Sequence, residues 1–275
     1  MIVDASMYFN EKELIELRVK YLDDLIDCFV IIEADVTHQG KKKKWNFPEV
    51  LKNNLKEFSH KIQYHQIKID VEKAESEKDP RYKGNYGRSW RIENVQRNFI
   101  RNACQKFSQD DIIIISDADE IASKEKISFV KSCDFKTVAP IAFEQALFHL
   151  NCNYLNLEQW IGSVVTTKKL IDKYEPQVFR TNKNRISHFT DAGWSFSSFG
   201  GVNKVIEKFE AFAHEEFNKE KYKSESHIIK CIKEGSDLFH RDIKSKKVDK
   251  NFFPKELLKL MERNSTFYFG SNTTL

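Results

Sequence analysis

The chain has 275 residues, enough for one large domain or two small ones with a substantial core. Lysine and arginine number 45 against 41 acidic residues, a net charge of +4. Because no long basic helix or basic patch with interleaved aromatic residues accompanies this small surplus, we expect no nucleic-acid partner. The 22 Phe, 9 Tyr and 4 Trp indicate an aromatic-rich core with some rings left to line a binding cleft.

The five cysteines are scattered and show no C-x-x-C spacing, so we expect reduced thiols in a reducing compartment. The first residues lack a basic leader followed by an apolar stretch, which predicts no secretory signal. No run approaches the ~18 apolar residues of a membrane span. We therefore expect a cytoplasmic chain without a transmembrane segment.

The first part of the chain alternates apolar strand-like runs with helical patterns, which is typical of βαβ units and a mostly parallel sheet. Ile2 and Val3 are predicted to form a short strand that ends at Asp4. Asn10 and Glu13 have the spacing of a capping box, so a helix is expected to follow them. Further predicted elements are strands over 28–32, 61–69 and 112–115 and a helix over 90–103.

The polar stretch from Asp70 to Gly87 is predicted to be a long loop. Beyond it, strand-like pieces lie at 138–143 and 163–167, and helical periodicity returns at 202–212 and 228–232. No internal repeat or strong linker interrupts the chain. We expect one α/β domain over residues 1–275, with a mostly parallel central sheet flanked by helices.

Three carboxylates follow the most apolar predicted strand. The run Ile112–Ile115 leads into Asp117, Asp119 and Glu120. At the carboxyl end of a parallel strand, where ligands bind in open α/β sheets, Asp117 and Asp119 would project into one crevice. Two hard oxygen ligands one residue apart suit a divalent ion that also grips a diphosphate. Such an ion would neutralise charge on a departing UDP-type leaving group.

The same acidic pattern admits other interpretations. A phosphatase with an aspartyl-phosphate intermediate also ends a strand in D-x-D, with the first Asp as nucleophile. That motif normally opens its domain, whereas Asp117 follows a complete βα half with its own acidic strand ends at Asp4 and Glu33. A non-catalytic carbohydrate-binding protein is the third alternative.

Several segments, taken in order, resemble glycosyltransferase family 17, whose best-known members are bisecting β-1,4-N-acetylglucosaminyltransferases. The matching segments are Phe9-Asn10-Glu11 with Leu14 and Arg18, Phe29–Asp35, Thr37–Lys41, Trp90 with Glu93 and Arg97, Ile115–Ile121, and Ala192–Ser197.

The resemblance implies a GT-A-like nucleotide-sugar-binding fold that transfers a sugar, with inversion, from a UDP-sugar donor to a hydroxyl of a glycan or glycolipid acceptor. It also implies that the donor is UDP-N-acetylglucosamine and the cofactor a divalent metal, Mn or Mg. Residues 1–121 would then form the nucleotide-sugar and metal-binding half, and residues 122–275 the acceptor-side half. The family often carries His where Ser195 stands here, which bears on the acceptor.

Candidate residues follow from the strand ends, the basic helix before the acidic strand and the matching segments. We expect the donor to be bound by Asp4, Glu33, Lys41, Trp90, Arg91, Arg97 and Asp117. The metal ligands are expected to be Asp117 and Asp119, with His240 as a third.

The stretch 188–201 combines a carboxylate, a Trp and permissive glycines. Inverting transfer needs a base to take the acceptor proton, and we expect Asp191 in this role, with Glu144 as the reserve. Trp194 is expected to stack on the acceptor sugar.

Overall fold

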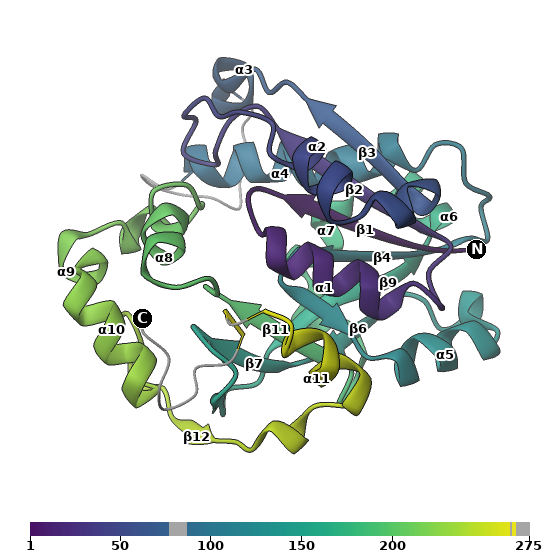
Figure 1. Cartoon of the computed structure of the whole chain (residues 1–275). Helices are drawn as coiled ribbons and strands as arrows, with labels where there is room; N and C mark the ends of the chain where they lie inside the picture. The colour runs from purple at the N-terminus through teal and green to yellow at the C-terminus, as the bar shows by residue number, and fades with distance from the viewer. Residues whose placement is uncertain (77–86, 265, 268–275) are drawn as a thin grey trace.

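Two β-sheets form the centre of the molecule in the computed structural model, which describes residues 1–76, 87–264 and 266–267 (Figure 1). The larger has seven strands in the order β10-β6-β9-β4-β1-β2-β3, and the smaller has five in the order β12-β8-β7-β11-β5. The large sheet consists of β1 (Ile2–Tyr8), β2 (Cys28–Ala34), β3 (Ile62–Ile67), β4 (Ile112–Asp117), β6 (Ile141–Glu144), β9 (Ile161–Thr167) and β10 (His188–Phe189). The small sheet consists of β5 (Glu120–Ala122), β7 (Ala146–His149), β8 (Tyr154–Asn156), β11 (Gly193–Ser197) and β12 (Ser245–Lys247).

Helices cover the sheets and fill the connections between strands (Figure 1). The α-helices are α1 (Lys12–Leu22), α2 (Phe47–Asn53), α3 (Val71–Ser76), α4 (Gly87–Ala103), α5 (Lys124–Ser132), α6 (Lys168–Lys173), α7 (Pro176–Thr181), α8 (Val202–Phe209), α9 (Glu220–Lys223), α10 (Glu225–Glu234) and α11 (Lys255–Met261). Short 3₁₀ helices are η1 (Lys56–Lys61), η2 (Phe135–Thr137), η3 (Lys183–Arg185), η4 (Glu215–Phe217) and η5 (Lys250–Phe252).

The large sheet is mostly parallel, as predicted. Strands β3, β2, β1 and β4 run in parallel, and only β9 is antiparallel to its two neighbours, β4 and β6. The carboxyl ends of β1, β2 and β4 therefore share one edge of the sheet with the beginning of β9. The predicted mixed α/β architecture with helices flanking a mostly parallel sheet is confirmed.

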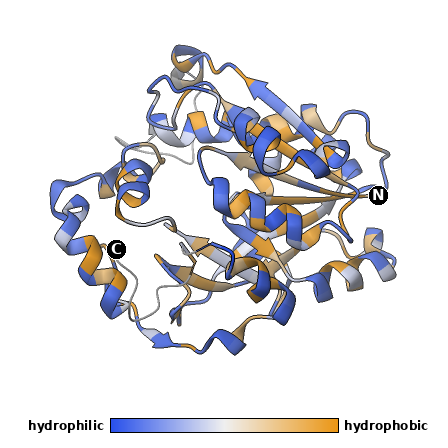
Figure 2. Ribbon diagram, viewed as in Figure 1, coloured by the Kyte–Doolittle hydropathy of each residue, from blue (hydrophilic) through white to orange (hydrophobic). Residues whose placement is uncertain are grey.

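Both faces of the large sheet are buried, which explains why its central strands are continuously apolar. On one face, Val3 and Val30 pack with Ile92 and Ile100 of α4. The opposite face packs against α1, α11 and the small sheet. Figure 2 shows the apolar residues concentrated on the strands between these layers. A third apolar cluster joins α8, α9 and α10.

Two local predictions were wrong. Strand β1 does not end at Asp4, because the buried guanidinium of Arg18 pairs with this carboxylate and the strand continues to Tyr8. The capping box does not form either: α1 is preceded by Glu11, whose own carboxylate accepts from the backbone N–H of Asn10.

The predicted helix over 90–103 is confirmed as α4, and the strands over 28–32 and 112–115 as β2 and β4. Part of the predicted loop over 70–87 is helical as α3, and its residues 77–86 lie outside the described residues. Within the described ranges, we find no helix with both the length and the apolar character needed to cross a bilayer.

Candidate active site

The turn from Asp117 to Glu120 connects the two sheets. Asp117 is the last residue of β4, and Glu120 is the first residue of β5. The backbone N–H of Asp117 donates to Oε2 of Glu120 at 3.1 Å, and the carbonyl of Asp119 accepts from the N–H of Phe196 at 2.8 Å. These bonds fix the backbone of the acidic turn against β11 and hold the carboxylate of Glu120.

Arg18 holds this turn from the buried side. Its guanidinium pairs with Asp4, contacts Ser116, and donates to the carbonyls of Asp117 and Glu120. Arg18 and Asp4 are each 1% exposed, so neither reaches a ligand. The expectation that Asp4 binds the donor was therefore wrong. The carboxylate of Asp4 forms an ion pair with Arg18, which in turn holds the acidic turn.

Two further arginines neutralise Asp117. Nη2 of Arg97 lies 2.8 Å from Oδ1 of Asp117, and Nη2 of Arg180 lies 2.7 Å from Oδ2. Arg180 also forms a buried ion pair with Glu120, and Arg97 with Glu93. Burial by itself would raise the pKa of Asp117, but Arg180 and Arg97 hold it well below its usual range. Asp117 is thus a permanent anion.

Asp119 has a different environment. Its Oδ2 lies 3.3 Å from Nζ of Lys208 on α8. Burial, together with the neighbouring Asp117, Glu120 and Glu11, raises the pKa of Asp119 to about 6, although Lys208 acts in the opposite direction. The negative charge of Asp119 is therefore less completely neutralised by neighbouring cations than that of Asp117.

A cavity of about 690 Å³ opens in front of both carboxylates. The edge formed by β1, β2 and β4 supplies one wall, and α4, α7 and the segment after α8 supply the others. Aromatic rings also line it, among them those of Trp90, Phe209, Phe212, Phe217 and Phe239. Its size and its mixture of apolar walls with a few charged groups are typical of small-molecule sites.

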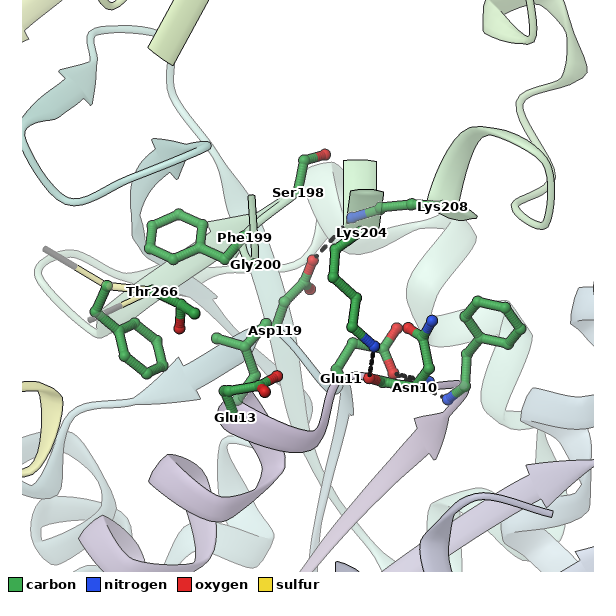
Figure 3. Close-up of a pocket in the computed structure, with 13 residues that line it drawn as sticks. Asn10, Glu11, Glu13, Asp119, Ser198, Phe199, Gly200, Lys204, Lys208 and Thr266 are labelled. Atoms are coloured by element: carbon green, nitrogen blue, oxygen red, sulfur yellow. Dashed lines mark hydrogen bonds and ion pairs between the residues drawn. The ribbon is translucent and has the colours of Figure 1, made fainter. Parts of the chain in front are cut away.

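A small pocket of about 30 Å³ adjoins this cavity at Asp119 (Figure 3). Asp119, Glu11 and Lys208 line both spaces, and Lys204 lines the small one.

Lys183 also lines the cavity, and it differs from Arg97 and Arg180 in its partners. Its Nζ lies 4.2 Å from the ring centroid of Trp160, and it forms no ion pair with a carboxylate in the part of the chain that the structure describes. Burial and the neighbouring Arg180 lower the pKa of Lys183 to about 8. A half-buried cation beside another cation favours an anionic ligand.

Four of the predicted site residues line the cavity together: Trp90, Arg97, Asp117 and Asp119. Trp90 is half-buried, and its ring meets that of His214 edge-on at 4.6 Å.

Besides Asp4, three further predicted donor residues do not line the cavity. Glu33 is fully buried and accepts hydrogen bonds from Lys43, from Tyr64 and from backbone N–H groups, so it anchors the start of α2. Lys41 is exposed in the turn after β2, and Arg91 lies half-buried on α4. The expectation that these three bind the donor finds no support in their positions.

The predicted acceptor-side residues also lie outside the cavity lining. Asp191 is exposed on the loop before β11, and Glu144 pairs with His188 at 3.1 Å. Neither lines the cavity. Trp194 is 7% exposed and packs edge-on against Tyr21, so it belongs to the core and offers no free face to a sugar. For Trp194 the reason is that the sequence does not reveal which face of β11 meets the cavity, which Ser195 and Ser197 line instead.

His240 does not complete a metal site. Its side chain is exposed, and its ring packs against His227 and Tyr222. Among the described residues, no group of three His, Cys, Asp or Glu side chains is arranged to hold a metal ion. The expectation that His240 joins Asp117 and Asp119 as a third metal ligand is therefore not met in the described part of the chain.

A metal shared with a ligand is compatible with the residues present. Mg²⁺ commonly takes only one or two carboxylates and fills its remaining positions with water and phosphate oxygens. Asp119, incompletely neutralised and open to both spaces, fits such a ligand. Both oxygens of Asp117 already accept from arginine, so this residue fits a supporting role.

Sequence reasoning missed Arg180, Lys183 and Lys208. None stands in a motif or at a spacing that predicts a site. Their contribution depends on α7, η3 and α8 being folded over the edge of the sheet.

Strand-end carboxylates facing a large cavity with buried basic side chains are typical of α/β enzymes that bind phosphorylated ligands. A model of glycosyltransferase family 17 matches residues 1–263, and the chain belongs to that family.

Curated relatives include beta-1,4-mannosyl-glycoprotein 4-beta-N-acetylglucosaminyltransferases. The Homo sapiens and Rattus norvegicus proteins are each 31% identical to this chain over 147 residues, which is 52% of this chain and 25% of the relative. The Mus musculus protein is 30% identical over the same length. The match thus spans a quarter of these relatives' own length.

Solved structures show a weaker likeness. The galactosyltransferase LgtC in complex with donor and acceptor sugar analogs has a TM-score of 0.38 at 12% identity, over 67% of this chain and 63% of that chain. A putative glucose-1-phosphate thymidylyltransferase from Bacillus anthracis has a TM-score of 0.37 at 12% identity, over 70% of this chain and 87% of that chain.

Proposed function

We propose that this chain transfers N-acetylglucosamine from UDP-N-acetylglucosamine to a hydroxyl of a glycan or glycolipid acceptor, with inversion and with a divalent metal, Mn²⁺ or Mg²⁺. The observation that carries the proposal is the position of Asp117 and Asp119 at the end of β4, facing a cavity of about 690 Å³ together with Lys183. The name of the curated relatives supports the choice of sugar.

The diphosphate would lie in front of the acidic turn. Lys183 is suited to bind it, because this half-buried cation forms no ion pair with a carboxylate in the described part of the chain. Arg97 and Arg180 already pair with carboxylates, so their main role would be to hold Asp117 and to keep the net charge of the turn close to neutral. Without these arginines, the turn would repel the donor.

Asp119 would hold the metal together with the diphosphate and water. When bound, a divalent ion supplies Lewis-acid stabilisation of the charge that develops on the leaving diphosphate. The protein's part is to hold the backbone of Asp119 through the hydrogen bond from the N–H of Phe196, so that this residue lies at the cavity.

The base that accepts the proton of the acceptor hydroxyl would be one of the carboxylates in the cavity. Glu11 and Glu158 line it and form no ion pair with Lys or Arg among the described residues. Oε2 of Glu11 already accepts from two backbone N–H groups, whereas Glu158 is exposed beside the start of β9, away from β1 and β2. Glu158 is therefore our candidate for the base.

The test is to incubate the purified protein with UDP-N-acetylglucosamine, UDP-glucose or UDP-galactose, with Mn²⁺, Mg²⁺ or chelator, and to follow UDP release with and without glycan acceptors. We expect fastest turnover of UDP-N-acetylglucosamine, loss of turnover in chelator, and an inverted anomeric centre by NMR.

Two results would instead favour the alternatives. Release of phosphate from a small ester without an acceptor sugar would identify a phosphatase. Glycan binding that needs neither metal nor UDP, without turnover of any donor, would identify a binding module.

A further inference from the structure

Lys208 is the cation nearest to the proposed metal ligand. Its Nζ lies 3.3 Å from Oδ2 of Asp119 (Figure 3). The same Nζ lies 3.5 Å from Oγ of Ser197. Among the described residues, Lys208 is the one basic side chain that forms an ion pair with Asp119. The other carboxylates of the turn, Asp117 and Glu120, have arginine partners instead.

A divalent ion and Lys208 therefore compete for one carboxylate. Oδ1 of Asp119 is on the same carboxyl group, so an ion bound to it would still lie within a few ångströms of the ammonium. Two cations at this distance repel each other, and partial burial limits the screening by water. The ion alone would thus bind weakly while Lys208 remains in place.

A diphosphate changes this balance. Lys208 lines the large cavity as well as the small pocket, and its four-carbon stem allows the ammonium to turn towards an anion in the cavity. Negative charge in the cavity would attract Lys208 and free Asp119 for the metal. By reciprocity, metal on Asp119 would release Lys208 to the diphosphate.

We propose that Lys208 is a stand-in cation that occupies Asp119 in the ligand-free protein and couples metal binding to nucleotide binding. The inference rests on the proposed function, because it assumes a divalent metal on Asp119 and a diphosphate in the cavity. Lys208 is then a positioning residue: it weakens the binding of metal alone and strengthens the binding of the diphosphate alone.

The experiment measures Mn²⁺ affinity without nucleotide and UDP affinity in chelator, both by calorimetry, for wild type and Lys208→Met. We expect Lys208→Met to bind Mn²⁺ alone several-fold to about tenfold more tightly and UDP alone several-fold more weakly. The factor by which UDP tightens Mn²⁺ binding should fall, and Lys208→Arg should retain it. A merely structural role would weaken both affinities.

Lys204 provides the matched control. It lies one helical turn before Lys208 on α8 and lines the same small pocket, but its Nζ donates to the carbonyl of Asn10 at 3.0 Å. Lys204→Met should leave the affinity for Mn²⁺ alone within about twofold of wild type.

The failure of this inference is distinguishable from that of the proposed function. If wild type binds Mn²⁺ and Asp119→Asn does not, but Lys208→Met binds it no more tightly than wild type, the coupling role is overturned and the metal assignment stands. If wild type binds no Mn²⁺ with or without UDP, both are overturned.

Discussion

Arg180 and Glu120 form a bidentate ion pair beneath the cavity. Nη1 of Arg180 lies 2.8 Å from Oε2 and Nη2 lies 2.9 Å from Oε1, and neither side chain is more than 6% exposed. Because Nη2 also reaches Asp117, one guanidinium ties the end of β4 to the start of β5. The same group therefore determines both the stability of the turn and the charge that it presents to a ligand.

Removal of this arginine should strongly destabilise the protein. Arg180→Met leaves Glu120 buried without its partner, so we expect the free energy of unfolding to fall by about 3–5 kcal/mol in chemical denaturation. The double variant Arg180→Met/Glu120→Leu should recover part of this loss. Lys250→Met, which breaks an exposed pair with Glu262, is the control and should leave Tm unchanged. Equal stability of Arg180→Met and wild type would contradict the structural role.

Asp119 and Asp191 should differ in their effect on transfer. Asp119→Asn removes the incompletely neutralised carboxylate at the cavity, so we expect metal-dependent UDP release to fall by at least ~10²-fold. Asp191→Asn should retain turnover close to wild type, because Asp191 is exposed and does not line the cavity. Initial rates with donor and acceptor measure both. A large loss in Asp191→Asn with normal UDP affinity would restore this residue as the base.

Nucleotide binding should depend on pH through Lys183. Burial and Arg180 lower its pKa to about 8 from an ordinary value of 10.5, so the ligand-free protein loses this positive charge as the pH rises through 8. UDP affinity should therefore decline above pH 8, by at most tenfold per pH unit. Lys183→Arg keeps its charge and should remove the decline between pH 7 and 9. Calorimetric titrations of both proteins check this, and parallel pH profiles would contradict the assignment.

Trp194 should contribute to stability and not to acceptor binding. Its ring packs in the core against Tyr21 and Phe253, with ring centroids 6.0 Å and 6.3 Å apart. We expect Trp194→Ala to lower the free energy of unfolding by about 3–5 kcal/mol. Trp194→Phe should unfold at a somewhat lower temperature and keep the acceptor KM. If Trp194→Phe instead raised the acceptor KM and left Tm unchanged, a stacking role would be indicated.

The central strands could be predicted because their signal is local. Strands buried on both faces need continuous apolar runs, which 28–32 and 112–115 provide. The helical periodicity of 90–103 likewise follows from one apolar face on the sheet. The extent of β1 was not predictable in this way, because Asp4 is buried only through its pairing with Arg18, 14 residues further on.

The order of residues along the chain was enough to predict that Asp117 and Asp119 follow a buried apolar strand, and it indicated a family whose model matches residues 1–263. Which other side chains reach that strand end became known from the folded chain. Arg180, Lys183 and Lys208 converge there from separate helical segments, whereas Asp191 and Trp194 do not line the cavity. Apolar periodicity is a pattern within one helix or strand, so it can be read along the chain. Charge pairing in a cavity depends on which elements the core brings together across the edge of a sheet, and these elements are far apart in the sequence.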